Sequence, residues 1–312
     1  MTFSIVITTF NRLPWLQRAV ESALAQTVPC QVVIADNAST DDTQTYVESL
    51  GDRVLYHRNP TNLHHAGAVN AGVALATGDW VKLLDDDDYL APTCIEAMAA
   101  AIACHPEAVI CSCQAAQVDS TGTELSRTPP MGPGQVFYVP QVAIHYGMFL
   151  EQVPFGTPAQ VAVKRSALVQ SGGWDLALTG CDDIDSWIRV AEYGDALFIN
   201  DCLAYRTCWS GGYDQKIQLR RRLETNVLMK ARIYERVSDR YRPALPSLAT
   251  TTQYLHLHWA MVALKQRQLG TALALGWPGL LSRPAWQLLL TARRTGRGAT
   301  AGSAVPKFVV LQ

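Results

Sequence analysis

The stretch Trp-Val-Lys-Leu-Leu-Asp-Asp-Asp-Asp, residues 80–88, joins an apolar run directly to four adjacent carboxylates. Residues 80–84 have the short, mainly apolar composition of a buried strand. Four carboxylates buried together repel one another, which raises their pKa values unless a cation compensates the charge. A divalent cation with oxygen ligands does this well. The stretch therefore predicts a strand that ends at a metal site, and an acidic solvated loop is the plainer alternative.

An EF-hand calcium loop is a further alternative for the same carboxylates. Asp85, Asp87 and Glu96 match positions one, three and twelve of such a loop. The sixth position, where the loop turns sharply and needs glycine, is Leu90, and Pro92 lies inside the loop. We therefore exclude an EF-hand.

Upstream of this stretch, short apolar strands alternate with helical segments. We expect strands at residues 3–9, 32–35 and 54–56, a helix over residues 15–26, a second helix ending at Leu50, and a helical segment over residues 70–76. Such alternation through about residue 110 indicates a parallel sheet with helices on both faces. Ligands bind such sheets at the carboxyl ends of the strands.

Polar residues stand at three of these predicted strand ends. Thr8 and Thr9 end the first strand, Asp36 and Asn37 follow the second, and the aspartates follow the fourth. Asp36 and Asn37 could bind a nucleobase edge or a ribose, or serve only as an Asx turn before the next helix. Because Ser39 or Asp41 could cap that helix, we expect Asp36 to be free for a ligand.

A second carboxylate cluster lies far downstream, where a loop beginning at Gly172 meets a predicted helix. Asp182 and Asp183 stand at the start of that helix, whose dipole favours the ionised form and lowers a carboxylate pKa. Simple capping, with an Asp185–Arg189 helix pair, is the alternative.

Two further polar groups leave their roles open. His64 and His65 lie in a predicted loop before Asn70, where a phosphate contact and a solvated histidine pair are equal alternatives. The basic run at residues 220–222 is typical of a solvated helix face, although it could touch acidic lipid or a diphosphate.

The rest of the chain adds a Pro- and Gly-rich loop at residues 128–134, a strand at 160–163 and a helix opening at 164–166. From about residue 215 the pattern is mainly helical, and the Gly- and Ala-rich tail from Thr295 is expected to be loosely ordered.

Composition excludes several classes of protein. The chain has 312 residues, of which 48% are hydrophobic and 17% charged, so it can bury a core and is not disordered. A formal charge of −1 gives no field that would recruit nucleic acid. The 8 cysteines form no C-x-x-C pair, which argues against zinc and for reduced thiols in a cytosolic protein.

Membrane contact is expected to be peripheral at most. Residues 1–7 read as a strand and lack the basic start of a signal peptide. The most apolar segment, residues 269–290, is interrupted by Pro278 and Pro284, so it could lie on a membrane but is a poor spanning helix. We expect a cytoplasmic protein that rests on the inner membrane face, with packing of this segment on the rest of the chain as an equal alternative.

Four segments together resemble the family 2 glycosyltransferases of the GT-A fold. They are Thr8–Arg12, Val33–Asp41, Thr77–Asp88 and Gly172–Asp183, and the resemblance extends from Phe3 to about Gly212. It implies an α/β fold of the GT-A (Rossmann-like) type: a mixed, mainly parallel sheet flanked by helices, with a mainly helical C-terminal extension. Residues 1–110 would be the nucleotide-sugar-binding half, residues 111–213 the acceptor-binding half, and residues 214–312 the helical region.

The resemblance also implies an inverting transfer of a sugar from a nucleotide diphosphate sugar to a glycan or lipid-linked acceptor hydroxyl. The donor-binding set would be Thr8, Thr9, Asp36, Asn37, His64, Asp85 and Asp86. Asp87 resembles the Mn²⁺ or Mg²⁺ ligand of the D-x-D motif, and Asp183 resembles the catalytic base. Many relatives have aspartate where Asn37 stands, so a UDP-sugar is favoured but the base stays open.

Two absences in the sequence favour single sugar addition over polymerisation. Near Gln218 the chain reads Leu-Arg-Arg-Arg, which departs from the Q-x-x-R-W motif of processive synthases, and their many membrane spans are missing. A nucleotidyltransferase that makes a nucleotide sugar is a rival, but residues 3–14 lack its glycine-rich phosphate loop. A catalytically silent sugar-binding protein is the other alternative.

Overall fold

The structure, a computed structural model, describes residues 1–209 and 217–295, with side chains described up to residue 292. The described residues fall into two compact units: Met1–Gln141 with Phe155–Trp209, and Val142–Pro154 with residues 217–295. The tail expected to be loosely ordered lies in residues 296–312, outside the described residues.

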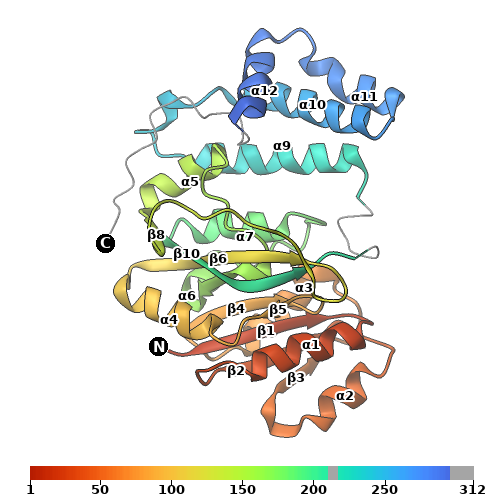
Figure 1. The fold of residues 1–312 in the computed structure, drawn as a ribbon, viewed down its shortest axis with the longest axis vertical. Coiled ribbons are helices and arrows are strands. Elements are labelled where there is room, and N and C mark those ends of the chain that lie inside the picture. Colours follow the sequence, from red (N-terminus) through yellow and green to blue (C-terminus); the bar gives the residue numbers. More distant parts are fainter. Residues whose placement is uncertain (210–216, 296–312) are drawn as a thin grey trace. The chain divides into compact units, whose positions relative to one another are not determined.

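The first unit is built on one sheet (Figure 1). Within the described residues its ten strands are β1 (Phe3–Thr9), β2 (Gln31–Asp36), β3 (Leu55–Arg58), β4 (Trp80–Asp85), β5 (Tyr89–Leu90), β6 (Ala108–Val118), β7 (Glu124–Arg127), β8 (Val136–Val139), β9 (Val161–Lys164) and β10 (Asp195–Thr207). The order is β3-β2-β1-β4-β9-β6-β10-β5, with β7 beside β6 and β8 beside β10. Strands β1 to β4 are parallel, whereas β9 runs antiparallel to β4 and β6. The prediction of a mixed sheet flanked by helices is confirmed.

Helices cover both faces of this sheet. They are α1 (Leu13–Leu24), α2 (Thr43–Ser49), α3 (His64–Leu75), α4 (Cys94–Cys104), α6 (Arg165–Gln170) and α7 (Asp182–Val190). Because strand side chains alternate, Ile5 and Ile7 join a core cluster with α1 and α4, while Val6 points to α3. Gly72 of α3 lies so close that a Cβ there would be 2.5 Å from Val6 Cγ1.

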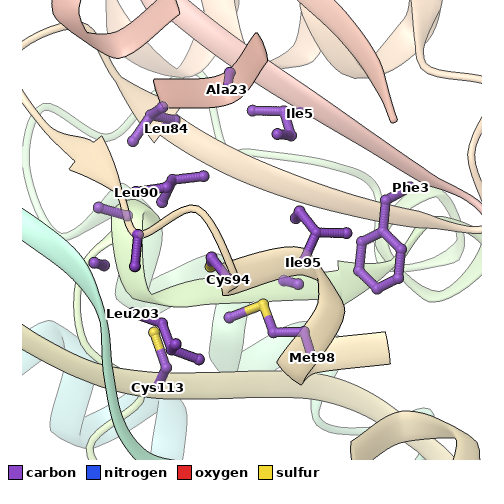
Figure 2. Packing of buried hydrophobic residues seen from close by; sticks show 14 of the residues in the cluster. Phe3, Ile5, Ala23, Leu84, Leu90, Cys94, Ile95, Met98, Cys113 and Leu203 are labelled. Carbon is purple, nitrogen blue, oxygen red and sulfur yellow. The ribbon is translucent and has the colours of Figure 1, made fainter. Parts of the chain in front are cut away.

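The core cluster on the α1 and α4 face is large, and the buried Lys82 lies on the same side of β4 as its members Trp80 and Leu84. Figure 2 shows side chains of β1, α4, β6 and β10 meeting there, among them Ile5, Ile95, Cys113 and Leu203. All eight cysteines are free thiols, as expected. Burial raises the pKa of Cys111, which therefore behaves as an inert apolar side chain.

Two helix boundaries differ from the prediction. Helix α1 begins at Leu13, two residues early, because Pro14 is accommodated in the first turn of a helix. Helix α3 begins at His64, six residues before the expected start, so His64 and His65 are helical and not in a loop. His64 has a left-handed backbone (φ 60°) that turns the chain into the helix.

The second unit is helical, as predicted for the C-terminal extension. It contains most of α5 (Gln141–Phe149), and α9 (Leu219–Arg236), α10 (Leu248–Lys265), α11 (Leu269–Gly276) and α12 (Arg283–Thr295). Its core cluster joins α9 through Leu223, α10 through Leu257, α11 through Leu275 and α12 through Leu289. No helix in the described part of the chain combines the length and apolar character needed to cross a bilayer.

Candidate active site

The polar ends of three adjacent parallel strands meet at one edge of the sheet. In the register of β1 with its neighbours, Thr9 pairs with Asp36 of β2 and Thr8 pairs with Asp85 of β4. This is the convergence that the sequence predicts, and it follows from strands of matched length that run in one direction.

The four aspartates of residues 85–88 do not share one environment. The side chains of Asp85 and Asp87 are 27% and 18% exposed, whereas Asp86 and Asp88 are buried. Asp85 ends β4, and the next residues form a turn in which the Asp88 amide donates to the Asp85 carbonyl at 3.1 Å; this turn leaves Asp85 and Asp87 facing outward. Asp85 and Asp87 are therefore the two aspartates that a ligand can reach.

Asp86 anchors the loop after β1. It accepts hydrogen bonds from Thr9 Oγ1 at 2.9 Å and from Arg12 at 2.9 Å. Burial raises its pKa to about 7, against the lowering effect of the Arg12 charge. A donor contact by Asp86 stays a prediction; in the structure its side chain is buried and bonded to Thr9 and Arg12.

Asp87 lies between a cation and an indole. Its Oδ2 accepts from Trp209 Nε1 at 2.9 Å and lies 3.3 Å from Arg12. The Arg12 guanidinium in turn stacks 5.3 Å from the Trp209 ring centre. Burial and the neighbouring charge of Asp85 raise the pKa of Asp87.

These carboxylates fit a divalent cation that is held largely by its substrate. Burial raises the pKa values of Asp86, Asp87 and Asp88, which marks an excess of negative charge that a cation would relieve. Within residues 1–209 and 217–295, however, no three His, Cys, Asp or Glu side chains gather closely enough to form a metal cage. Mg²⁺ commonly binds through one or two carboxylates with substrate phosphates and water, and Asp87 with Asp85 meets that pattern.

His65 of α3 bridges two carboxylates from distant parts of the chain. Its Nε2 lies 2.9 Å from Asp85 Oδ1 and its Nδ1 lies 3.1 Å from Asp182 Oδ2. Burial alone would lower the pKa of His65, but the charges of Asp85 and Asp182 and their hydrogen bonds raise it well above its usual value. His65 is therefore an imidazolium that donates to both carboxylates.

The same bridge tunes Asp85. Burial would raise its pKa, but the charge and hydrogen bond of His65, with a hydrogen bond from Thr8 Oγ1 at 3.3 Å, lower it. Asp85 is thus ionised and held in place at the edge of the site.

Helix α3 also positions the loop that carries the downstream carboxylates. Asn70 accepts from the backbone N–H of Trp174 at 2.8 Å and donates to its carbonyl at 2.9 Å. Gly173 has a left-handed backbone (φ 68°) and approaches Asn70 so closely that a Cβ would lie 2.8 Å from its Oδ1. The His65 ring packs edge-on against the Trp174 ring, 5.1 Å between centres.

Asp182 and Asp183 open α7, as predicted, after Cys181 in a left-handed conformation (φ 53°). The Asp182 carboxylate is paired with His65. Within the described residues, Asp183 has only a local hydrogen bond, from the Ile184 amide at 2.8 Å. Asp183 is half-buried. It is thus the carboxylate at this helix start that has an oxygen left for a substrate.

The pKa of Asp183 differs from the expectation based on the helix dipole. Burial and the adjacent negative charge of Asp182 raise its pKa to about 7, and they outweigh the amide hydrogen bond and the His65 charge. A carboxylate with such a pKa is a stronger base than an ordinary aspartate, and about half of it is ionised at neutral pH.

Other features of α7 match the prediction, with one change. Trp187 and Ile188 are buried, and Arg189 donates to Asp185 at 2.8 Å. That pair was expected on the outer side of the helix, but Asp185 is 0% exposed. The Arg189 guanidinium reaches inward because it also donates to the Ser171 carbonyl.

Asp36 and Asn37 are engaged within the fold and not free. Asp36 accepts from the Ser39 amide at 2.8 Å and from the Tyr56 hydroxyl at 2.7 Å. Asn37 is also nearly fully buried, and its side chain bonds to residues 59–64 of the next loop. Direct contact of Asp36 and Asn37 with a nucleobase stays a prediction. In the structure their side chains hold the neighbouring loops in place.

His65, and not His64, contacts the carboxylates of the site, while a donor contact by His64 stays a prediction. The His64 side chain is exposed, and its backbone carbonyl accepts from Asn37. The sequence did not assign a defined role to His65, Arg12 or Trp209. The adjacent histidines were a usable signal for His65, but choosing between them needed the helix phase. Arg12 closes the segment Thr8–Arg12 that carries part of the family resemblance, whereas Trp209 has no local signal.

Comparison with known proteins agrees with this geometry. The family described as "Glycosyl transferase family 2" matches residues 4–171. A glucosyltransferase of Escherichia coli, the UDP-Glc:alpha-D-GlcNAc-diphosphoundecaprenol beta-1,3-glucosyltransferase WfaP, is 36% identical over 92 residues, 29% of this chain and 37% of that protein. The succinoglycan biosynthesis protein ExoO of Rhizobium meliloti is 38% identical over 91 residues, 28% and 26% of the two chains. The aligned part thus spans less than half of each of these two relatives.

Solved structures share the fold across nearly the whole chain. Residues 1–349 of TarS from S. aureus, in complex with UDP-GlcNAc, give a TM-score of 0.62 at 16% identity, covering 95% of this chain and 93% of that one. The mannosyltransferase PcManGT from Pyrobaculum calidifontis, in complex with GDP-Man and Mn²⁺, gives 0.59 at 22% identity, covering 94% and 80%.

Proposed function

Because this chain belongs to glycosyltransferase family 2 and has its GT-A fold, we propose that it transfers a sugar from a nucleotide diphosphate sugar to an acceptor hydroxyl with inversion. The observation that carries the proposal is the joining of two carboxylate groups by His65. Asp85 and Asp87 stand on the donor side, and Asp183 stands beside Asp182 on the other. One site thus holds the carboxylates that would bind the metal ion of the diphosphate leaving group and the carboxylate that would act as the base.

The chemistry assigned to Asp183 is general-base catalysis. Asp183 takes the proton of the acceptor hydroxyl, the hydroxyl oxygen forms a bond to the anomeric carbon, and the bond from that carbon to the diphosphate oxygen breaks. The nucleoside diphosphate leaves with the electron pair on the side opposite to the attack, which inverts the anomeric centre. Such a base contributes on the order of 10²–10⁴-fold to the rate.

The donor side works by charge and position. Asp85 and Asp87 would hold Mn²⁺ or Mg²⁺, which when bound offsets the negative charge of the diphosphate. Arg12 and His65 are cations beside these carboxylates, so they keep Asp85 and Asp87 ionised and oriented. Thr8, with Asp36 and Asn37 behind it, forms the floor on which the nucleotide would lie.

Residues 1–110 would bind the donor, residues 111–213 would supply the acceptor side, and residues 214–312 would form a helical region beyond the chemistry. UDP-sugars are the favoured donors. TarS was solved with UDP-GlcNAc, and WfaP is named for UDP-Glc, whereas PcManGT was solved with GDP-Man. WfaP is also named for a diphosphoundecaprenol acceptor, which supports a lipid-linked acceptor, cell-surface glycan synthesis, and action in the cytoplasm at the inner membrane face.

Calorimetry with UDP, GDP and their sugars, with Mn²⁺ and with excess chelator, tests donor binding and metal dependence. Product analysis then tests the reaction. A family 2 enzyme releases nucleoside diphosphate from its donor, whereas a nucleotidyltransferase releases pyrophosphate from a nucleoside triphosphate. A donor that binds but never yields nucleoside diphosphate, with any acceptor offered, would favour the silent sugar-binding protein.

A further inference from the structure

Large apolar side chains line one exposed face of the second unit. Leu269, Leu273, Trp277 and Leu281 are 67%, 76%, 76% and 96% exposed. Leu269 and Leu273 lie in α11, Trp277 opens the single turn Trp277–Gly279 that continues it, and Leu281 lies two residues after that turn. Residues four apart lie on the same side of a helix, so the first three side chains share one side; together with the neighbouring Leu281 they are here called the apolar stripe.

The apolar stripe lies opposite the face that the segment buries. Ala272, Leu275 and Gly276 are buried in the direction of α10. Gly279 is packed so tightly that a Cβ there would lie 2.5 Å from the Gln253 carbonyl oxygen of α10. The segment is therefore apolar on both sides, and its own unit covers only one of them. Surface helices of globular proteins normally turn a polar face outward.

The sequence around the apolar stripe has a one-sided charge. All 27 Asp and Glu residues lie in residues 1–239, whereas nine of the 26 Lys and Arg residues lie in residues 240–312. The formal charge is therefore −10 for residues 1–239 and +9 for residues 240–312. Lys265, Arg267 and Arg283 are exposed and flank the stripe in the chain. The surface that would recognise this region is anionic and apolar at once.

We propose that the apolar stripe docks on an anionic lipid bilayer, with the helices lying in the plane of the interface. Leucines enter the boundary between headgroups and acyl chains, the Trp277 indole sits at headgroup level, and Lys and Arg side chains extend to the lipid phosphates. Helix α11 has 8 residues, too few to span, which fits a segment that lies on a membrane. The inference rests on the proposed function in one respect: the apolar stripe would bring the enzyme to the membrane that holds its lipid-linked acceptor.

Charge argues for lipid over a second copy of the chain. Two apolar stripes facing each other would bring together two regions of charge +9, and like charges across an interface oppose association. A bilayer rich in anionic lipid attracts the same charges, and each Lys or Arg near the surface adds to the binding.

Vesicle flotation tests the proposal without using the active site. The full-length chain should float with vesicles of phosphatidylglycerol and phosphatidylcholine, and much less with phosphatidylcholine alone. The variant Leu273→Ser/Trp277→Ser/Leu281→Ser should bind at least tenfold less. The control Leu125→Ser/Val169→Ser/Leu176→Ser changes three apolar residues of the first unit that are also more than half exposed, and it should float like the parent.

Each other outcome counts against the proposal. No flotation of the parent, equal loss in the control triple, or equal binding to neutral vesicles would overturn it. So would a dimer, measured by light scattering, that only the stripe variant loses. Transfer to a soluble acceptor separates this inference from the function: the stripe variant should keep it, and a parent that floats but never transfers would refute the function alone.

Discussion

The Nδ1 atom of His65 lies 3.1 Å from Oδ2 of Asp182, although the two residues are 117 positions apart in the chain. The contact occupies one of the two carboxylates that open α7 and leaves the other, Asp183, for the substrate. Because His65 also bonds to Asp85, one residue connects the carboxylate at the end of β4 with those that open α7.

Replacing His65 tests this shared role. His65→Asn removes the cation and both hydrogen bonds, and we expect kcat to fall roughly tenfold, since charged hydrogen bonds are worth about 1.5–3 kcal/mol and this one is partly solvated. The control His105→Asn changes another half-buried histidine that packs on an aromatic ring, and it should keep full activity. With Asp182→Asn, the loss should be clearly less than additive. Additive losses would mean that the two residues act independently.

The two neighbouring carboxylates should differ sharply in their kinetic effect. Asp183→Asn is nearly isosteric, and we expect it to lower kcat on the order of 10²-fold or more while calorimetry shows unchanged donor binding. Asp182→Asn should lower kcat less. Asp182 acts only indirectly, through its contact with His65 and through its negative charge beside Asp183. If Asp182→Asn lost most activity and Asp183→Asn stayed active, the catalytic base would be Asp182. If both variants kept full activity, neither carboxylate would act as the base.

The pH dependence of kcat/KM should follow the ionisation of Asp183. The base works deprotonated and its pKa is about 7, so activity should rise as pH increases through about 7 and then level off. Asp182→Asn removes a charge that raises this pKa, so the midpoint should move to lower pH. His65→Asn removes a charge that lowers it, so the midpoint should move to higher pH. Shifts in the same direction in both variants would contradict this electrostatic account.

Asp87 should govern metal-dependent donor binding. Asp87→Ala removes the more outward of the two carboxylates contacted by Arg12, and we expect calorimetric binding of UDP in the presence of Mn²⁺ to weaken at least tenfold. Asp52→Ala, at an exposed aspartate of the same unit, is the control and should bind normally. Donor binding that persists unchanged in excess chelator would refute the metal requirement. A thermal melt of each variant separates a lost ligand from a lost fold.

The sequence by itself determined the sheet and the edge at which the site lies. Apolar runs such as residues 3–9 and 80–84 form strands because of their own composition, and helices between them force a parallel arrangement. Parallel strands end on one edge, so Thr8, Asp36 and Asp85 had to converge there. Asp182 and Asp183 were also recognisable locally, because acidic residues favour the start of a helix.

Only the tertiary structure decided which of these groups face the substrate. The exposure of Asp85 and Asp87 and the burial of Asp86 depend on the turn after β4 and on the hydrogen bond that Asp86 accepts from Thr9, 77 residues away in the chain. His65, and not His64, contacts Asp85 and Asp182, and this depends on how α3 packs on the sheet, where Gly72 lies against Val6. The pKa of Asp183 went up and not down because burial and the charge of Asp182 outweigh a helix dipole, and burial is a property of the whole fold.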